Sequence, residues 1–162
     1  MGGAGRAFGH CISARGPETH GHHRFLAAAP GERAGKGEDM KLAERFKDGG
    51  MGVMATAGSD GAVNTAVYAV PHIVDEETVA WGMTEGRTHR FAKENPHASF
   101  LFFAPGGQGK GVRLTLALKN IETTGKLLEK IRARVSETVN PQAGAAMRYV
   151  VYFRVVETRP LY

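Results

Sequence analysis

The sequence predicts a mainly β protein with flanking helices, in which six antiparallel strands curl into a barrel. Two observations carry this prediction. Two strand-like runs early in the chain, residues 52–57 and 62–74, are separated only by a tight GSDG turn at residues 58–61, which indicates a hairpin. Helical segments then lie beside the later strands only, whereas a doubly wound parallel sheet needs a helix after each strand from the start.

A short leading helix precedes this hairpin in the prediction. Asp39 can cap its first turn, and Gly49 follows its end. The second hairpin strand, residues 62–74, contains Pro71. Because proline has no N–H to donate to a neighbouring strand, we expect this strand to reach an edge of the sheet or to bend at that residue.

The later elements follow from their apolar patterns. Residues 98–103 (ASFLFF) form a continuous apolar run, typical of a central strand that is buried on both faces. Residues 112–119 alternate between apolar and polar side chains, which indicates a strand with one face in the core. A helix is expected at residues 126–139 and ends before Pro141. The last strand, residues 147–157, places five apolar side chains on one face: Met147, Tyr149, Val151, Phe153 and Val155.

We predict one folded domain at residues 40–162, preceded by an extension at residues 1–39. The extension holds nine of the 22 glycines and four of the seven histidines, with few large apolar residues. Such a segment cannot bury enough apolar surface to offset its chain entropy, so we expect it to be disordered or poorly packed. Its histidines, His20, His22 and His23, lack a defined ligand set, and we expect no specific metal site.

Composition limits the class of protein. No run approaches the roughly 18 consecutive apolar residues that a membrane-spanning helix needs. A single cysteine, Cys11, cannot form an intramolecular disulfide. We therefore expect a soluble, cytoplasmic protein with no membrane partner. The net charge of +5 is spread along the chain and no basic stripe with stacking aromatics is present, so we expect anionic ligands and no nucleic acid.

Residues 78–95 are the stretch that most directly predicts a binding site. A strand runs through Gly86 directly into a short helical segment that begins at Thr88 and stops at Asn95. The unpaired N–H groups and the positive dipole end of a helix favour an anion. Arg87 adds a permanent charge and Thr88 a hydroxyl at the same place. The pattern predicts a phosphate cradle, and its ordinary alternative is an N-capping Thr88 beside a solvated Arg87.

Other familiar chemistries lack their motifs. The glycine-rich loop at residues 104–111 has Ala104 where a Walker loop needs glycine, and Gly111 where it needs serine or threonine. No GxSxG motif is present, so the sequence identifies no catalytic residue for hydrolysis. The domain histidines, His72, His89 and His97, are interpreted as solvated or capping residues.

Two polar residues on the second hairpin strand give the cradle a context. Asn64 and Thr65 place an amide and a hydroxyl among small apolar residues. Each also has an ordinary explanation, since threonine favours strands and Asn64 can end a turn. Together with the cradle, they predict a groove for a phosphorylated, partly aromatic ligand.

Three segments, VNTAVYAVPHIV from Val63, VAWGMTEGRTHRF from Val79 and KENPHASFLFF from Lys93, occur in this order. In order and spacing they resemble the FMN-binding split-barrel family, which includes pyridoxamine 5′-phosphate oxidase and small bacterial FMN-binding proteins. The resemblance covers residues 51–126. It implies a six-stranded antiparallel split β-barrel of the FMN-binding type. It also implies a homodimer with two FMN molecules at the subunit interface, each touched by both chains.

The resemblance also implies which residues bind the cofactor. Arg87 and Thr88 match the basic residue and the hydroxyl that hold the FMN phosphate in the family. The remaining matched positions border the flavin ring and the ribityl chain: Asn64, Thr65 and Ala66 on one strand, and the backbone at Met83 and Thr84 on the other. Contacts from the second subunit are expected from the loop at residues 104–111 and the strand after it.

This chain departs from pyridoxamine 5′-phosphate oxidase itself. That enzyme resembles it in the N-P motif but carries a basic-rich strand around the flavin and a C-terminal Arg and His pair for its substrate phosphate. Here the strand reads NTAVYAV and the chain ends in ETRPLY. We therefore expect an FMN-dependent oxidoreductase that acts on another small molecule, not vitamin B6 oxidation. The alternatives are a non-catalytic electron carrier or flavin reservoir, or the same barrel holding the deazaflavin F420 or haem.

Overall fold

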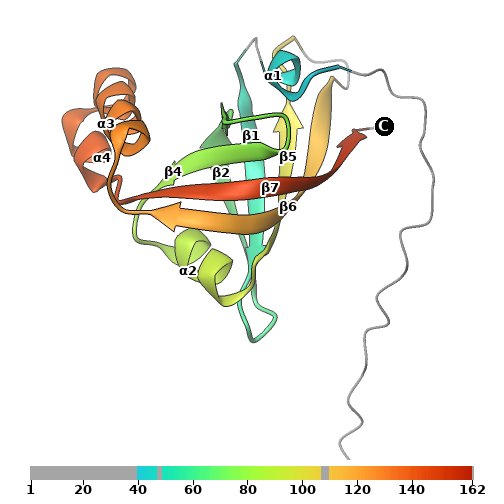
Figure 1. The fold of residues 1–162 in the computed structure, drawn as a ribbon, viewed down its shortest axis with the longest axis horizontal. Helices are drawn as coiled ribbons and strands as arrows, with labels where there is room; N and C mark the ends of the chain where they lie inside the picture. The colour runs from blue at the N-terminus through green and yellow to red at the C-terminus, as the bar shows by residue number, and fades with distance from the viewer. Residues whose placement is uncertain (1–39, 47–48, 107–109, 162) are drawn as a thin grey trace, which may run out of the picture. The chain divides into compact units, whose positions relative to one another are not determined.

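A computed structural model describes residues 40–46, 49–106 and 110–161. In these residues, seven strands form one antiparallel sheet in the order β2-β1-β5-β6-β7-β4-β3 (Figure 1). The described residues belong to one compact unit within Lys36–Tyr162. The elements, in chain order, are α1 Leu42–Arg45, β1 Met51–Ala57, β2 Val63–Ala69, β3 His72–Ile73, β4 Thr78–Met83, α2 Arg87–Glu94, β5 His97–Phe103, β6 Gly111–Glu122, α3 Lys126–Thr138, α4 Pro141–Ala146 and β7 Tyr149–Pro160.

The sheet curls into a half-barrel, which confirms the predicted mainly β, split-barrel architecture. The long strands β6 and β7 run side by side along 12 residues each, with register shifts at Thr115/Leu116 and Leu118/Asn120 that bend the pair (Figure 1). The edge strand β2 meets β4, which lies next to the opposite edge, because Trp81 Nε1 on β4 donates a 2.9 Å hydrogen bond to the Ala69 carbonyl at the end of β2.

The predicted strand at residues 62–74 is interrupted at Pro71, as its missing N–H suggested. The break leaves a seven-residue β2, paired with β1, and a two-residue β3, paired with β4. The sheet therefore has one strand more than the six predicted.

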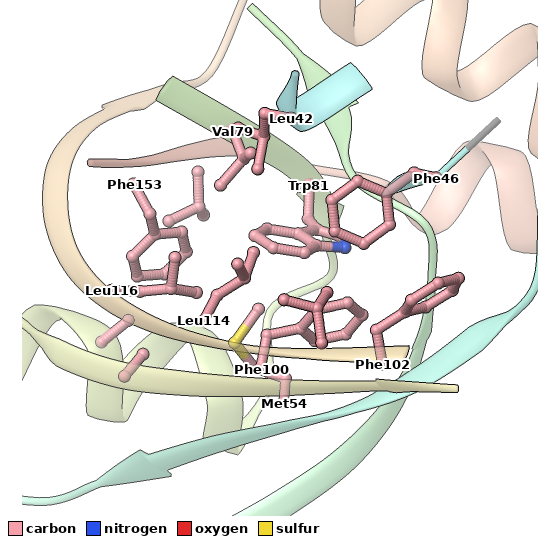
Figure 2. Close-up of a cluster of buried hydrophobic side chains, with 14 of the residues drawn as sticks. Leu42, Phe46, Met54, Val79, Trp81, Phe100, Phe102, Leu114, Leu116 and Phe153 are labelled. Atoms are coloured by element: carbon pink, nitrogen blue, oxygen red, sulfur yellow. The ribbon is translucent and has the colours of Figure 1, made fainter. Parts of the chain in front are cut away.

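The barrel interior is filled by alternate side chains of the curled sheet. Figure 2 shows Trp81 packed between Phe100 and Phe153, with ring centroids 4.8 Å and 6.0 Å from the Trp81 ring. Leu42 and Phe46, from the start of the described chain, also pack into this cluster. Burial of these large side chains stabilises the fold by about 25 cal/mol per Å² of apolar surface.

Helix α3 packs on the outer side of β4 and β7 through a second, smaller cluster. This cluster consists of Ala80, Leu128, Ile131 and Val150. Gly82 permits the close approach, since a Cβ there would lie only 2.5 Å from Ile131 Cγ2. Val150 is fully buried because α3 packs against it. The start of β7 is therefore covered on both faces, whereas the alternation of its sequence predicted one covered face.

The interpretation of β5 as a strand buried on both faces is wrong. It is an inner strand, between β1 and β6, as expected. Its side chains alternate, however: Phe100 and Phe102 are buried, whereas Ser99 is exposed and Phe103 is 50% exposed. No other described element covers the face that carries Phe103.

Two helix boundaries differ from the prediction. Lys41, not Asp39, holds the N-cap position of α1, and Asp39 lies outside the described residues. Asn140 and Pro141 end α3 but also begin α4, where the Asn140 side chain accepts a 2.8 Å hydrogen bond from Ala143 N and Pro141 occupies the first turn.

The predicted extension at residues 1–39 lies outside the described residues, as does the centre of the glycine-rich loop, residues 107–109. Among the helices that are described, none has the length and apolar character needed to cross a membrane.

Candidate functional site

The start of α2 presents backbone donors without a side-chain cap. Strand β4 ends at Met83, the chain turns through exposed residues, and Gly86 holds the N-cap position in an extended conformation. No side chain hydrogen bonds to the cap. Thr88 is the second residue of the helix, so the alternative in which it is the N-cap is wrong. The first N–H groups of α2 therefore remain available to an anion.

Thr88 and Asn64, which are 24 residues apart, meet at this helix start. Asn64 Nδ2 donates a 3.0 Å hydrogen bond to Thr88 Oγ1 in a partly buried contact. Tyr68 lies four residues further along β2, on the same face as Asn64, and its side chain also hydrogen bonds with Thr88. Burial raises the pKa of Tyr68, and its hydrogen bond with the Thr88 side chain partly offsets the rise. The inner face of β2 thus holds Thr88 in place.

Arg87 takes no part in these contacts and lines two adjoining hollows. In the described part of the chain its side chain makes no hydrogen bond or ion pair. The larger hollow has a volume of about 780 Å³ and is lined by Glu85, Gly86, Arg87, His89, Arg90, Lys93, Glu94 and Tyr149. The smaller, about 460 Å³, reaches toward the β1–β2 turn. Arg87 is therefore a cation in the walls of both hollows that forms no direct ion pair among the described residues.

The other charges in the larger hollow partly cancel. Arg90 Nε lies 3.6 Å from Glu94 Oε1, an exposed pair on consecutive turns of α2. Glu94 Oε2 also accepts a 3.2 Å hydrogen bond from Ser59 N, which ties the helix to the β1–β2 turn. Lys93 has no such partner among the described residues. Glu85 also lines the hollow, so the three cations among its described residues, Arg87, Arg90 and Lys93, exceed the two carboxylates by one, and the dipole of α2 adds to this positive charge at the helix start.

His89 corrects the interpretation of the domain histidines as solvated or capping residues. It is only 6% exposed, and its ring stacks on Tyr149 at 3.7 Å and 10° between the planes. Burial lowers its pKa, Lys93 lowers it further, and Glu85 partly offsets these effects. A neutral imidazole against a tyrosine ring gives the hollow an aromatic wall. His97 is exposed, and His72 lies in β3, outside this site.

The remaining predicted residues are placed differently by the sheet. Ala66 shares the inner face of β2 with Asn64, but the side chain of Thr65 points to the opposite face, as the alternation along a strand requires. Met83 is 1% exposed, with its side chain in the core, and its carbonyl accepts a 3.0 Å hydrogen bond from Arg148 N. Thr84 is exposed beside the helix start. The structure therefore brings together Asn64, Thr88 and Arg87, with Ala66 and Thr84 nearby, but not Thr65.

Sequence reasoning did not assign six of the residues that line the larger hollow: Glu85, His89, Arg90, Lys93, Glu94 and Tyr149. Arg90 and Lys93 follow Arg87 at intervals of three, which was a readable signal because residues three apart share a face of a helix. His89 and Tyr149 gave no local signal. Tyr149 comes from the start of β7, opposite Met83 in the register with β4.

Within residues 40–46, 49–106 and 110–161, no group of three or more His, Cys, Asp or Glu residues is arranged to hold a metal ion. The three histidines at positions 20, 22 and 23 lie outside those ranges.

No family model matches the sequence, and no curated protein matches it either. Solved structures do match the fold. An FMN-binding protein from Syntrophomonas wolfei subsp. wolfei is 19% identical, with a TM-score of 0.60 over 68% of this chain and 76% of that one. An F420 reductase is 15% identical, with a TM-score of 0.59 over 72% and 94%. A candidate pyridoxamine 5′-phosphate oxidase from Lactobacillus delbrueckii is 15% identical, with a TM-score of 0.54 over 72% and 88%. These similarities confirm the split-barrel fold.

Proposed function

We propose that this split-barrel protein binds FMN at the start of α2 and acts as an oxidoreductase on a small molecule. The observation that carries the proposal is the unpaired Arg87 beside the uncapped start of α2, with Thr88 held by Asn64. These groups suit the dianionic phosphate of FMN, because backbone N–H groups, a hydroxyl and a guanidinium are all donors. Two structural relatives bear the descriptions FMN-binding protein and F420 reductase, which supports a flavin-type ligand.

Arg87 should contribute most of the phosphate affinity. A charge-assisted hydrogen bond contributes about 1.5–3 kcal/mol, and about 1.4 kcal/mol corresponds to a tenfold change in affinity. Arg87→Ala should therefore weaken FMN binding by about tenfold or more. Thr88 and Asn64 should contribute less to the phosphate affinity, because their side chains already hydrogen bond to each other.

We further propose that two copies associate through the outer face of β2, β1, β5 and β6. This outer face consists of residues that alternate with the core positions: Val53, Ala55, Val63, Thr65, Val67, Ser99, Leu101 and Phe103. Val63 and Val67 are 71% and 67% exposed, and a shallow groove of about 510 Å³ runs between β2 and Leu161. Contiguous exposed apolar surface is typical of a protein interface. In this arrangement Thr65 faces the second copy.

Bound FMN supplies the electron transfer, and the protein binds and orients it. Arg87, the start of α2 and Thr88 hold the phosphate, and the His89–Tyr149 pair supplies an aromatic wall beside it. No side chain of this site is a catalytic acid or base in our proposal. The same arrangement also suits a non-catalytic electron carrier. Turnover of NADH or NADPH with an electron acceptor distinguishes the oxidoreductase from the carrier.

The first test compares FMN with riboflavin, which lacks the phosphate. Flavin fluorescence is titrated with the protein, with Arg87→Ala, and with Arg154→Ala as the matched control, since Arg154 is an exposed arginine on β7. We expect FMN to bind at least about tenfold more tightly than riboflavin. Arg87→Ala should remove this preference, and Arg154→Ala should retain it.

Equal affinities for FMN and riboflavin would contradict the proposal that the start of α2 binds the phosphate. A folded protein that binds neither would contradict the flavin assignment, and the same titration with F420 would then test the related deazaflavin.

A further inference from the structure

A separate cavity lies between the end of β2 and the α3–α4 pair. Its volume is about 430 Å³, and it shares no lining residue with the larger hollow at α2. Ligand sites for small molecules typically measure about 300–1,000 Å³, so this cavity has the size of a small-molecule site. It lies where Pro71 separates β2 from β3 and where Ile131 of α3 packs on Gly82 of β4.

The walls of the cavity are mostly apolar and well supported. Trp81 and Gly82 of β4 form one wall, and the Trp81 indole is fixed by its hydrogen bond to the Ala69 carbonyl. The Met147 carbonyl accepts a 2.8 Å hydrogen bond from Arg132 Nε, which holds the α4–β7 connection against α3. The remaining apolar side chains of the lining come from both sides: Val67, Tyr68, Val70, Pro71, Ile131, Val135, Val139 and Ala143.

Arg134 is the one permanently charged side chain that the structure describes in the cavity lining, whose other polar side chains are Tyr68, His72 and Thr138. Arg134 belongs to α3 and makes no side-chain hydrogen bond or ion pair in the described part of the chain. His72 belongs to β3. Burial lowers the pKa of His72, and the nearby charges of Arg134 and then Lys130 lower it further. No carboxylate is among the described residues that line the cavity, so Arg134 has no counter-charge in that lining.

We propose that this cavity binds a small organic acid: an apolar, ring-sized body against Trp81 and the α3–α4 side chains, with its carboxylate toward Arg134 and His72. A guanidinium recognises a carboxylate through paired hydrogen bonds, and His72 lies beside it as a second donor. The cavity is too small for a peptide helix or a nucleic-acid strand. This site goes beyond the flavin proposal and does not depend on it, because the cavity shares no lining residue with the larger hollow at α2, although Tyr68 of its lining hydrogen bonds with Thr88 of the proposed flavin site.

Trp81 makes the proposal directly testable. It is the only tryptophan in the 162 residues, and it lies in the cavity wall. Benzoate is titrated into the full-length protein while Trp81 fluorescence is recorded, and benzamide serves as the uncharged probe of the same shape. We expect a saturable change with benzoate and binding about tenfold weaker, or weaker still, with benzamide.

Two variants locate the binding. Arg134→Gln should weaken benzoate binding by about tenfold through loss of the charge, and Arg154→Gln, an exposed arginine on β7, should leave it unchanged. Ala143→Leu adds bulk to the lining without changing charge, and should also abolish the benzoate response. Circular dichroism of each variant confirms that it is folded.

Equal affinities for benzoate and benzamide, or a folded Arg134→Gln variant with unchanged affinity, would overturn the proposal. The absence of any saturable response would do the same. None of these outcomes bears on the FMN titration, since Arg87 lies outside this cavity, and a failure of FMN binding would leave the benzoate result standing.

Discussion

The inner and outer faces of the neighbouring strands β2, β1 and β5 differ in exposure, although both carry apolar residues. On the inner face of β1 and β5, Met54, Phe100 and Phe102 are at most 1% exposed. On the outer face of β2 and β5, Val67 is 67% and Phe103 is 50% exposed. Apolar residues therefore occur on both faces of these strands, but a single chain buries only the inner face. The comparison separates residues that hold the fold from residues that we propose hold a second copy.

The largest effect expected from this comparison is on stability. Phe100→Ala removes a fully buried ring that packs 4.8 Å from Trp81, and should lower the free energy of unfolding by about 3–5 kcal/mol. Phe103→Ala, three residues along the same strand, should cost less than about 1 kcal/mol because its ring is already half exposed. Urea denaturation at low protein concentration measures both.

Similar losses for the two variants would show that the outer face is also part of the folded core. The measurement is made at low protein concentration, because dimer formation would add to the apparent free energy of unfolding of the protein that retains Phe103.

The second prediction concerns the outer face alone. Val67→Lys should raise the dissociation constant of the proposed dimer by at least about tenfold, since an apolar contact would be replaced by a buried, unpaired charge. Val74→Lys is the matched control, because Val74 is a 49% exposed valine that follows β3 at the other edge of the sheet. Analytical ultracentrifugation measures the association of all three proteins.

A wild-type protein that stays monomeric would contradict the proposed dimer. Equal weakening by the two lysine variants would move the interface away from the outer face.

The smallest effect is a pH dependence of stability that comes from the half-buried His72 and the buried His89. The pKa values of His72 and His89 are lowered in the folded protein, for both mainly by burial. The unfolded chain then binds protons more readily, so this stability is present above the unfolded pKa of about 6.5 and is lost as the pH falls. Urea denaturation between about pH 7.5 and 5 should show a decreasing free energy of unfolding.

The double variant His72→Gln, His89→Gln should have a smaller slope over the same range. An unchanged slope would assign the pH dependence to other groups.

The candidate site was predictable to the extent that its residues are close in sequence. Arg87 and Thr88 were found because a strand, a glycine and a helix start follow one another in one short stretch. The pairing of Asn64 with Thr88 could only be expected loosely, since it depends on how β2 curls over α2. Thr65 was assigned to the site although the alternation along β2 turns its side chain to the outer face. Tyr149 joins the site from the far end of the chain and carried no local signal.

The same distinction explains the errors in the fold. Pro71 correctly marked the break between β2 and β3, because a missing N–H acts locally. The run of residues 98–103 was expected to be buried on both faces, but whether a second layer covers a strand is decided by other parts of the chain. Conversely, Val150 is buried on the outer side of β7 because α3 packs there. Helix α4 was missed although Asn140 and Pro141 are ordinary helix-start residues.

The sequence by itself determined most of the strands and turns and the position of the α2 start, because alternation, proline, glycine and helix ends act through neighbouring residues. The tertiary structure decided which face of each strand is covered, and which distant side chains share a hollow. It stacked His89 on Tyr149, and it left Arg134 and His72 on one side of a cavity without a carboxylate. These outcomes depend on the curl of the sheet and on where α3 packs, which are set by contacts between residues far apart in the chain.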